Sequence, residues 1–325
     1  MKKIITDLSV AVICISIFAP SIFGSGFGEI NKEYPEIYDG VYNGYDLDCP
    51  HINDLIHDDT LYCWGLLKDD SGKYYLESYL VPRLINDNTI NEKSIRVPDS
   101  VNGKEIEYIY GSCELRKFDL NPKNNYMKCV DNVIFSKDGK RLMSYGKFDE
   151  RTEYTVPEGT EAIEPIAFFD CDNITRIDIP DSVKRIEALS FCNDGLSEIS
   201  LTSLNVKIDK AAFGAYKKKQ VKLNICMQPK VHKTDNILVW DKNSDVSYYE
   251  IYQKLSNGEY KFLKTTKATA CKFTTLKNGK KYTFAVKPVA VIPAANYDKE
   301  KDEGEYPESF TIEGTMSEDI VVIGK

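Results

Sequence analysis

Apolar residues in the middle of the chain recur with a period of 22 or 23 positions. Three isoleucines and three phenylalanines share these intervals: Ile163, Ile186, Ile208, Phe168, Phe191 and Phe213. A fixed period of this length is typical of a repeat protein in which each unit is one turn of a solenoid. The pattern therefore predicts that equivalent isoleucines and phenylalanines lie one above another along a shared core.

One unit shows how the chain forms such a turn. Ile177 and Ile179 alternate with polar residues, so both side chains point to one face of a short strand. Pro180 ends the pairing because it lacks an N–H group. Val183 and Ile186 then bring the chain back over the core. Because no single coil can bury its apolar face, we expect a mainly β fold of stacked coils, with short parallel strands and irregular or 3₁₀ return segments.

The same pattern marks where the strands should begin. The expected first positions are Ile95, Phe118, Tyr154, Ile177, Ile199 and Val221. The interval of 36 between Phe118 and Tyr154 equals one repeat of 23 with 13 further residues inserted. The insert, near residues 130–145, has two apolar stretches on either side of an Asp138-Gly139 turn, and it predicts a β-hairpin.

These repeats resemble the BspA-like leucine-rich repeat family. Its I-x-I-P, V-x-x-I and A-F-x-x-C motifs are matched by Ile177–Pro180, Val183–Ile186 and Ala167–Cys171. The resemblance extends over residues 91–226, although the first unit lacks the Ala-Phe motif and Thr202 stands where proline is expected. It implies a leucine-rich-repeat solenoid and a bacterial surface protein that binds host proteins, other cells or matrix.

The period is lost after residue 226, where short apolar stretches alternate with turn residues in the manner of a β-sandwich. Residues 228–325 are similar to a fibronectin type III domain, with Trp240 as the core indole and Tyr282 in the tyrosine corner. The resemblance implies that the Tyr282 hydroxyl bonds to nearby backbone. Residues 293–308 are polar and charged, and we expect them to form a mobile loop between the last strands.

The N-terminal residues predict export. Lys2 and Lys3 precede an apolar run that small residues follow, so residues 1–26 have the pattern of a signal peptide. An uncleaved membrane anchor is the alternative for this segment. Residues 27–90 have no clear period, and we expect an N-terminal cap of uncertain fold that covers the open end of the solenoid. The protein is therefore expected to be extracellular, either secreted or held at the cell surface.

The net charge limits the classes of partner, and the cysteines bear on whether the protein contains disulfides. The formal net charge of −8 argues against a nucleic-acid partner and against docking on anionic lipid, so membrane contact is expected only through the N-terminal segment. Of the nine cysteines, Cys113, Cys171 and Cys192 lie within the repeats and are expected to be buried thiols. Cys49 and Cys63 form the pair most suited to a disulfide in an exported protein.

No motif predicts catalysis. A structural zinc site could in principle use Cys49, His51, His57 and Cys63, but only the spacing of the two His residues falls within the range of such sites. We therefore interpret the four as scattered surface and loop residues. The sequence has no Gly-x-Ser-x-Gly elbow, and its acidic pairs are typical of solvated turns. We therefore expect a non-catalytic protein without cofactor or metal. A hydrolase built on residues 27–90 is the remaining alternative.

Side chains that alternate with the buried strand positions should form an exposed face along the solenoid. This candidate binding face comprises Arg96, Lys117, Asp119, Thr155, Arg176, Asp178, Ser200 and Lys222. We predict adhesion or protein–protein interaction through it, with a protein or glycan ligand on a host, a neighbouring cell or matrix. The alternative is a non-catalytic carbohydrate-binding accessory protein of an extracellular polysaccharide-degrading system.

Overall fold

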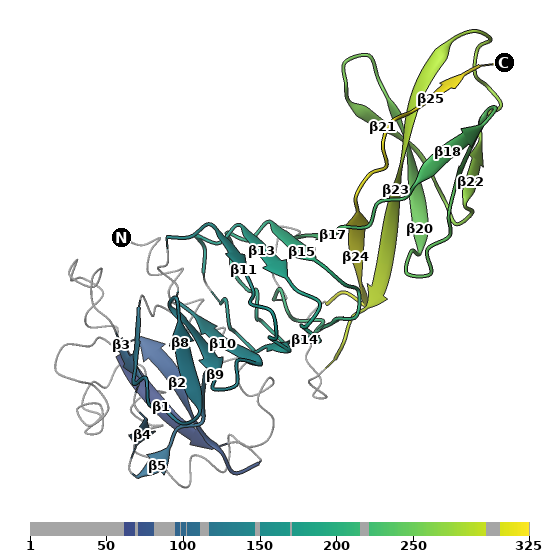
Figure 1. Ribbon diagram of the computed structural model, residues 1–325. Coiled ribbons are helices and arrows are strands. Elements are labelled where there is room, and N and C mark those ends of the chain that lie inside the picture. Colours follow the sequence, from purple (N-terminus) through teal and green to yellow (C-terminus); the bar gives the residue numbers. More distant parts are fainter. Residues whose placement is uncertain are drawn as a thin grey trace.

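The computed structural model describes most of the chain after residue 61. The described ranges are 62–68, 71–80, 95–97, 99–101, 103–110, 117–146, 150–169, 171–214, 221–296 and 306–324. The expected signal segment, residues 1–26, lies outside them. All the regular secondary structure in these ranges is β-strand. Figure 1 shows a solenoid with a second β module projecting from one end, and the chain ends at the far tip of that module.

Two parallel ladders of strands build the solenoid. The first contains β11 (Glu153–Thr155), β13 (Arg176–Ile179), β15 (Glu198–Leu201) and β17 (Lys222–Ile225). The second contains β12 (Ala162–Ile163), β14 (Arg185–Ile186) and β16 (Lys207–Ile208). Within the second ladder Ile163 pairs with Ile186, and Ile186 with Ile208, so the predicted stacking of these isoleucines is confirmed.

The return segments are irregular over most of their length, as predicted, but they also contain short strands that the sequence did not reveal. Each contains one of the two-residue strands of the second ladder, and the described residues include no 3₁₀ helix. These short strands form because the repeat length is nearly constant, which brings equivalent extended segments of neighbouring coils, such as 185–186 and 207–208, into register. Their backbone groups then pair with the neighbouring coil instead of with water.

A single apolar core runs through the repeats. Ile163, Ile177 and Ile186 are fully buried. The rings of Phe168 and Phe191 lie 5.5 Å apart, and those of Phe191 and Phe213 lie 5.8 Å apart, so the predicted phenylalanine stack is also confirmed. Two further rings extend it. Tyr145 lies 5.1 Å from Phe168 at one end, and Phe310 lies 5.7 Å from Phe213 at the other.

The insert between the first and second parts of the solenoid is a three-stranded antiparallel meander. It consists of β8 (Met127–Val130), β9 (Val133–Ser136) and β10 (Arg141–Tyr145). The expected hairpin is β9–β10, and β8 is a strand that the sequence did not reveal. Asp131 and Asn132 both have positive φ, 49° and 63°, as the type I′ turn between β8 and β9 requires.

The N-terminal part has its own core. It contains β1 (Tyr62–Lys68), β2 (Tyr74–Leu80), β3 (Ile95–Val97), β4 (Ser100–Val101), β5 (Lys104–Glu105), β6 (Tyr108–Tyr110) and β7 (Phe118–Leu120). Strands β1, β2 and β6 form one sheet, and β3 pairs in parallel with β7 in another. Leu76, Ile109 and Phe118 belong to one buried cluster that is separate from the core of the later repeats.

The last predicted strand start, Val221, is wrong, because the residue that pairs with Ile199 lies two positions later in the chain. Strand β17 begins at Lys222, and Ile199 pairs with Leu223. The interval is therefore 24, whereas Phe191 and Phe213 are 22 apart. Two additional residues between Phe213 and Leu223 shift the strand relative to the repeat pattern.

The C-terminal module places two sheets around a small core. One sheet contains β18 (Val231–Thr234), β19 (Ile237–Trp240) and β22 (Ala270–Lys272). The other contains β20 (Tyr248–Lys254), β21 (Tyr260–Thr266), β23 (Lys281–Pro293) and β25 (Ile320–Ile323). Trp240 is buried between them at 2% exposure. The backbone N–H of Lys277 donates to the Tyr282 hydroxyl at 3.1 Å, as the sequence predicts.

The module and the solenoid share one sheet, which the sequence did not predict. Strand β24 (Ser309–Gly314) pairs in parallel with β17 and antiparallel with β23, so a nine-stranded sheet crosses the expected domain boundary. Phe310 and Ile312 of β24 complete the repeat core.

The second ladder is continued in the same way by Ala295. Its N–H donates to the carbonyl of Ile208 at 2.7 Å, and its carbonyl accepts from Lys210 at 2.8 Å. Ala295 belongs to the segment 293–308 that we expected to be mobile, so this part of the expectation is wrong; residues 297–305 lie outside the described residues. Strand β24 and Ala295 together occupy the place of one further coil and cover the open end of the solenoid.

Candidate interaction face

The shared sheet has one face on the core and one in solvent, which we call the outer face. Strand pairing aligns its outward side chains in rows, because residues paired across neighbouring strands point the same way. One row runs through Thr155, Asp178, Ser200, Asn224 and Glu313. Four of these residues lie on repeat strands and the fifth on β24, so the row passes from the solenoid into the module without a break.

A second row alternates in charge. It consists of Glu153, Arg176, Glu198 and Lys222 in register. Arg176 lies 3.0 Å from Asp178 and 3.8 Å from Glu198, and hydrogen bonding to Asp178 raises its pKa. These side chains are between 37% and 41% exposed. Exposed ion pairs contribute only about 0–1 kcal/mol each to the free energy of folding. These pairs therefore do more to hold the charges in a fixed order than to stabilise the fold.

The network continues onto the module. Lys222 lies 3.7 Å from Glu313, Glu313 lies 3.1 Å from Lys287, and Lys287 lies 3.0 Å from Glu250. The Tyr252 hydroxyl donates to Glu250 at 2.6 Å. Partial burial opposes the charge of Lys287, but its bonds to Glu250, Glu313 and Tyr252 outweigh this effect and raise its pKa. The chain of contacts therefore fixes side chains across the junction of the two parts.

The structure brings together only part of the predicted binding face. Thr155, Arg176, Asp178, Ser200 and Lys222 lie on the outer face of the nine-stranded sheet. The remaining three predicted residues do not. Asp119 is exposed on β7, in the separate β3–β7 sheet, and Lys117 is exposed directly before that strand. The backbone of Arg96 lies in β3, and its side chain is outside the described residues.

Several residues of the outer face were not predicted. Glu198 occupies the same position in β15 as Arg176 does in β13, so the repeat pattern could have revealed it. Glu313, Lys287 and Glu250 come from the module. They follow from the pairing of β17 with β24, for which the sequence has no repeat signal.

The other side of each coil carries a row of carboxylates. Glu164, Glu187 and Asp209 directly follow the three stacked isoleucines. Arg141 binds both oxygens of Glu164, at 2.8 Å and 2.9 Å, whereas Glu187 has one contact, with Arg185 at 3.0 Å. Burial, with a smaller contribution from the neighbouring carboxylates, raises the pKa of Glu187 to about 7 although Arg185 opposes the change. This row therefore contains a group that titrates near neutral pH.

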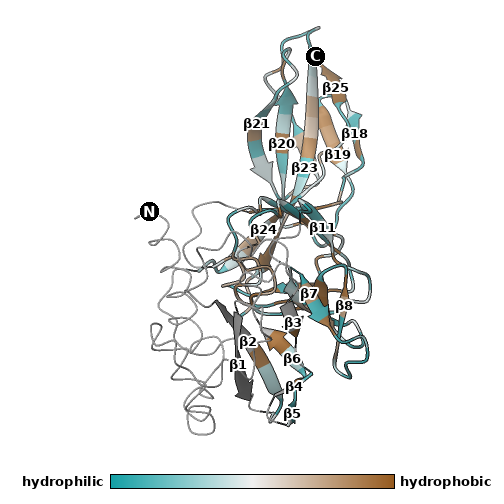
Figure 2. Ribbon diagram, turned by 90° about the vertical axis from the view of Figure 1, so that its left-hand side faces the viewer, coloured by the Kyte–Doolittle hydropathy of each residue, from teal (hydrophilic) through white to brown (hydrophobic). Residues whose placement is uncertain are grey.

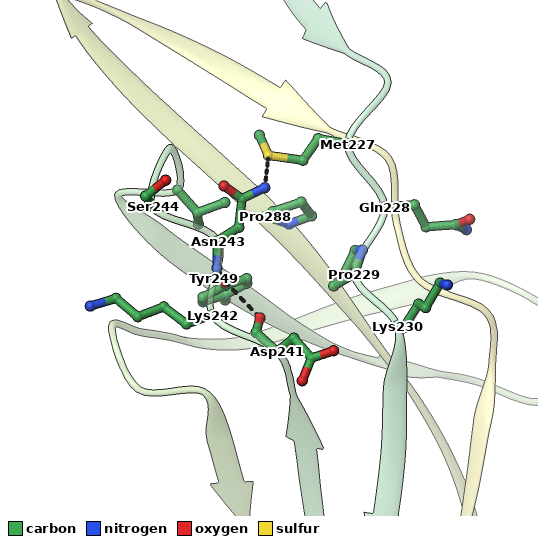
Figure 3. A pocket seen from close by; sticks show the side chains of 11 residues that line it. Met227, Gln228, Pro229, Lys230, Asp241, Lys242, Asn243, Ser244, Tyr249 and Pro288 are labelled. Atoms are coloured by element: carbon green, nitrogen blue, oxygen red, sulfur yellow. Dashed lines mark hydrogen bonds between the residues drawn. The ribbon is translucent and has the colours of Figure 1, made fainter.

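A pocket of about 490 Å³ lies at the junction (Figure 3). Met227, Asn243, Tyr249 and Pro288 are among its lining residues. Two contacts join lining residues: the amide of Asn243 donates to the Met227 sulfur at 3.0 Å, and the Tyr249 hydroxyl lies 3.5 Å from the carbonyl of Asp241. These contacts hold the junction side of the pocket together.

The other sequence candidates fall in different places. Cys171 is a buried thiol as predicted, Cys192 is half-buried, and Cys113, Cys49, His51 and His57 lie outside the described residues, as does the side chain of Cys63. The described ranges contain no group of three or more His, Cys, Asp or Glu suited to a metal ion. Within them we also find no helix with the length and hydrophobicity of a membrane span.

Comparison with protein families assigns two regions. Residues 143–236 match the BspA type leucine rich repeat region, in six copies. Residues 218–305 match the C-terminal domain of GH85 endohexosaminidases, a non-catalytic part of those proteins. The first match agrees with the resemblance drawn from the repeat motifs. No match to a fibronectin type III family accompanies it, and no curated protein matches the chain.

Three solved structures are similar to 42% of this chain, which spans 42% to 51% of their lengths. A leucine-rich repeat protein from Eubacterium ventriosum is 19% identical over 42% of each chain, with a TM-score of 0.33. A leucine rich cell surface protein from Faecalibacterium prausnitzii is 20% identical over 42% of each chain, with a TM-score of 0.32. The pneumococcal vaccine antigen PcpA is 16% identical over 42% of this chain and 51% of its own, with a TM-score of 0.26.

Proposed function

We propose that this protein is an exported, non-catalytic interaction protein that binds a protein partner through the outer face. The BspA-type repeat match and the cell-surface protein among the similar structures fit this role. The single observation that carries the proposal is the continuity of the outer face across the junction. Polar and charged side chains are in register from β11 to β24, and ion pairs continue them to Lys287 and Glu250, so the face presents a long surface to one partner.

The chemistry of this face suits recognition more than catalysis. Its central charges, on Arg176, Glu198 and Lys222, are half-exposed and alternate in sign, so a partner with the complementary order of charges would dock in one register. Toward the module the face becomes less exposed, with Lys287 at 13% and Glu250 at 19%. Preorganised charges of this kind lose little side-chain entropy on binding.

The test uses the full chain with two charge reversals, Arg176→Glu and Lys222→Glu. Labelled protein is applied to wells coated with extracellular-matrix proteins and to intact epithelial and bacterial cells. The matched control carries Lys184→Glu and Lys207→Glu, which change the net charge equally at exposed positions away from the outer face. We expect saturable binding that weakens about tenfold or more in the face variant and stays unchanged in the control. Equal binding by both variants would contradict the proposal.

Export is tested separately. Cell fractionation combined with N-terminal sequencing of the mature protein determines whether residues 1–26 are removed. We expect the protein in the medium or on the cell surface, beginning near residue 27. Recovery of the intact chain from the cytosol would contradict the proposed location.

A second candidate function is glycan binding as an accessory protein. The match of residues 218–305 to the C-terminal domain of endohexosaminidases favours it, since those enzymes cleave glycans. We infer for this module the arrangement of a fibronectin type III domain, which the buried Trp240 and the Tyr282 hydroxyl contact support. Binding of the full chain to a glycan array separates this candidate from the first. A protein that binds only protein partners should give no signal on any glycan of the array.

A further inference from the structure

The charged row on the outer face is its own complement. From β11 to β17 it consists of Glu153, Arg176, Glu198 and Lys222, so the signs run minus, plus, minus, plus. Because the number of charges is even, the same row read backwards runs plus, minus, plus, minus. A second copy of this row, turned to run the opposite way, therefore presents an opposite charge to every member of the first.

One two-fold rotation produces this arrangement. If two outer faces meet with the axis parallel to the strands and midway between β13 and β15, Glu153 faces Lys222 of the second copy, and Arg176 faces Glu198 of the second copy. Each contact then occurs twice, as a symmetric interface requires. Arg176 and Glu198 lie 3.8 Å apart within one chain, so the two copies would bring two arginines and two glutamates together in alternation at the axis.

The neighbouring row of the face is compatible with the same rotation. It contains Thr155, Asp178, Ser200 and Asn224 on the same four strands. The rotation places Thr155 opposite Asn224 and Asp178 opposite Ser200, so polar groups that can form hydrogen bonds meet and no like charges do. An axis perpendicular to the strands would instead set the two rows against each other, and only Arg176 and Asp178 would then join opposite charges. The charges therefore favour the axis parallel to the strands.

Stability of the sheet explains only part of this alternation. Opposite charges on neighbouring strands stabilise a sheet when their side chains are in contact. Of the three neighbouring pairs in the row, only Arg176 and Glu198 form an ion pair. Glu153 forms none with a described residue, and Lys222, 57% exposed, lies 3.7 Å from Glu313 of β24. The two ends of the row therefore carry charge that a partner can reach.

The C-terminal module leaves this part of the outer face open. Residues 289–293 of β23 pair with β24 beside the repeats, whereas residues 283–289 pair with β20 in the module. Because both parts belong to one strand, the module extends along the strand direction and not outward from the face. Figure 1 and Figure 2 show it rising beyond the repeats. A rotation about an axis parallel to the strands therefore carries the second module to the opposite end of the pair, pointing the same way.

The size of the repeat face indicates a weak association. Four strands about 4.8 Å apart span about 14 Å, and three or four residues of each extend about 10–13 Å. This area is far below the roughly 800 Å² per partner that stable complexes bury. We therefore expect a dissociation constant of about 0.1 mM in solution. Copies held close together on one surface would pair more readily, because their effective concentration is higher.

We propose that the partner of the outer face is a second copy of this chain, paired face to face through the two-fold rotation described above. This pairing rests on the proposed function, because it names the partner of the same face. It requires the charge at position 176 of one copy to be opposite to the charge at position 198 of the other. Charge reversals at these two positions therefore test it directly.

The test measures self-association of the full chain by sedimentation equilibrium. Arg176→Glu places like charges together at the axis, and so does Glu198→Arg. Each variant alone should associate about tenfold or more weakly than the wild type, because each change affects two symmetric contacts. In an equal mixture of the two variants, the new acidic side chain of one meets the new basic side chain of the other, and every contact again joins opposite charges. The mixture should therefore associate within about threefold of the wild type.

A double variant and two controls make the test specific. Arg176→Glu combined with Glu198→Arg should associate with itself but not with the wild type, because like charges would meet at the axis of the mixed pair. The matched controls are Lys184→Glu and Glu161→Arg, which change the net charge by the same amounts at positions 45% and 53% exposed and away from the outer face. Each should associate as the wild type does. Circular dichroism verifies that all variants fold.

Three results would overturn the proposed pairing: a wild type that stays monomeric at about 0.5 mM, single variants that associate as well as the wild type, or a mixture that associates no better than its components. Failure of the leading proposal gives a different result. If Arg176→Glu abolishes attachment to matrix proteins or cells while the wild type stays monomeric, the outer face binds a foreign protein and only the pairing of two copies is wrong.

Discussion

Glu187 provides the sharpest test of how the repeats respond to pH. Its side chain is 15% exposed and its single ion-pair contact is with Arg185 at 3.0 Å, between the carboxylates of Glu164 and Asp209 in the adjacent coils. Its pKa is raised from 4.5 to about 7. A carboxyl whose folded-state pKa is raised takes up a proton more readily in the folded protein than in the unfolded chain. This group therefore favours folding increasingly as the pH falls from 7 to 4.5.

The magnitude follows from the shift. At about 1.4 kcal/mol per pKa unit, the charged carboxylate costs about 2–3 kcal/mol of folding free energy above pH 7 after allowance for solvent at its rim. Replacing Glu187 with Gln removes the charge and keeps the shape. We expect Glu187→Gln to raise the unfolding free energy by about 2–3 kcal/mol at pH 8, and by little at pH 5, where the wild-type carboxyl is already protonated.

Urea unfolding followed by circular dichroism at several pH values measures this difference. The control is Glu161→Gln, on the same side of the solenoid but 53% exposed. We expect its effect on the unfolding free energy to be small and independent of pH between 5 and 8. The reasoning is refuted if the curves of wild type and Glu187→Gln stay parallel across this range, because the carboxyl would then titrate equally in both states.

Three further changes test the packing. Phe191→Ala removes a fully buried ring between two others and should lower the unfolding free energy by about 3–5 kcal/mol, measured by urea unfolding, whereas Phe262→Ala at an exposed site should change it by less than about 0.5 kcal/mol. Arg141→Met leaves the buried Glu164 without its bidentate partner and should cost about 2 kcal/mol in the same assay, with partial recovery in the double variant with Glu164→Gln. Gly314→Ala would place a Cβ atom 2.7 Å from the carbonyl oxygen of Met227, so limited proteolysis should cut this variant near the junction sooner than the wild type; equal cutting rates would show that the strand can shift without loss.

The repeats could be predicted because their signal recurs. Each coil is specified by residues within 23 positions of one another, and the isoleucine and phenylalanine intervals report a contact between neighbours that is repeated several times. The same regularity explains the one register error. The interval from Ile199 to Leu223 is two residues longer than the interval from Ile177 to Ile199, and the sequence between Phe213 and Leu223 has no apolar pattern that would reveal the change in length.

The junction could not be predicted, because it depends on contacts between distant residues. Leu223 pairs with Ile312, 89 positions away, and Ser309–Gly314 carries none of the repeat motifs. Alternating apolar residues such as Phe310 and Ile312 predict a strand, but not the neighbour that it chooses. The part of the outer face that lies on the module was missed for this reason: Arg176 follows from a local pattern, whereas Lys287 requires knowledge of the pairing.

Closure of the solenoid by β24 has a consequence for how the chain is made. The partner of Leu223, Ile312, is synthesised 89 residues after it, when most of the module has already been made. Until then the newest coil has an apolar, unpaired edge, the kind of surface that aggregates or is captured by chaperones. A chain truncated before Ser309 lacks β24, so the last repeat strand, β17, keeps an unpaired edge by which quality-control proteases can distinguish an unfinished molecule from a finished one.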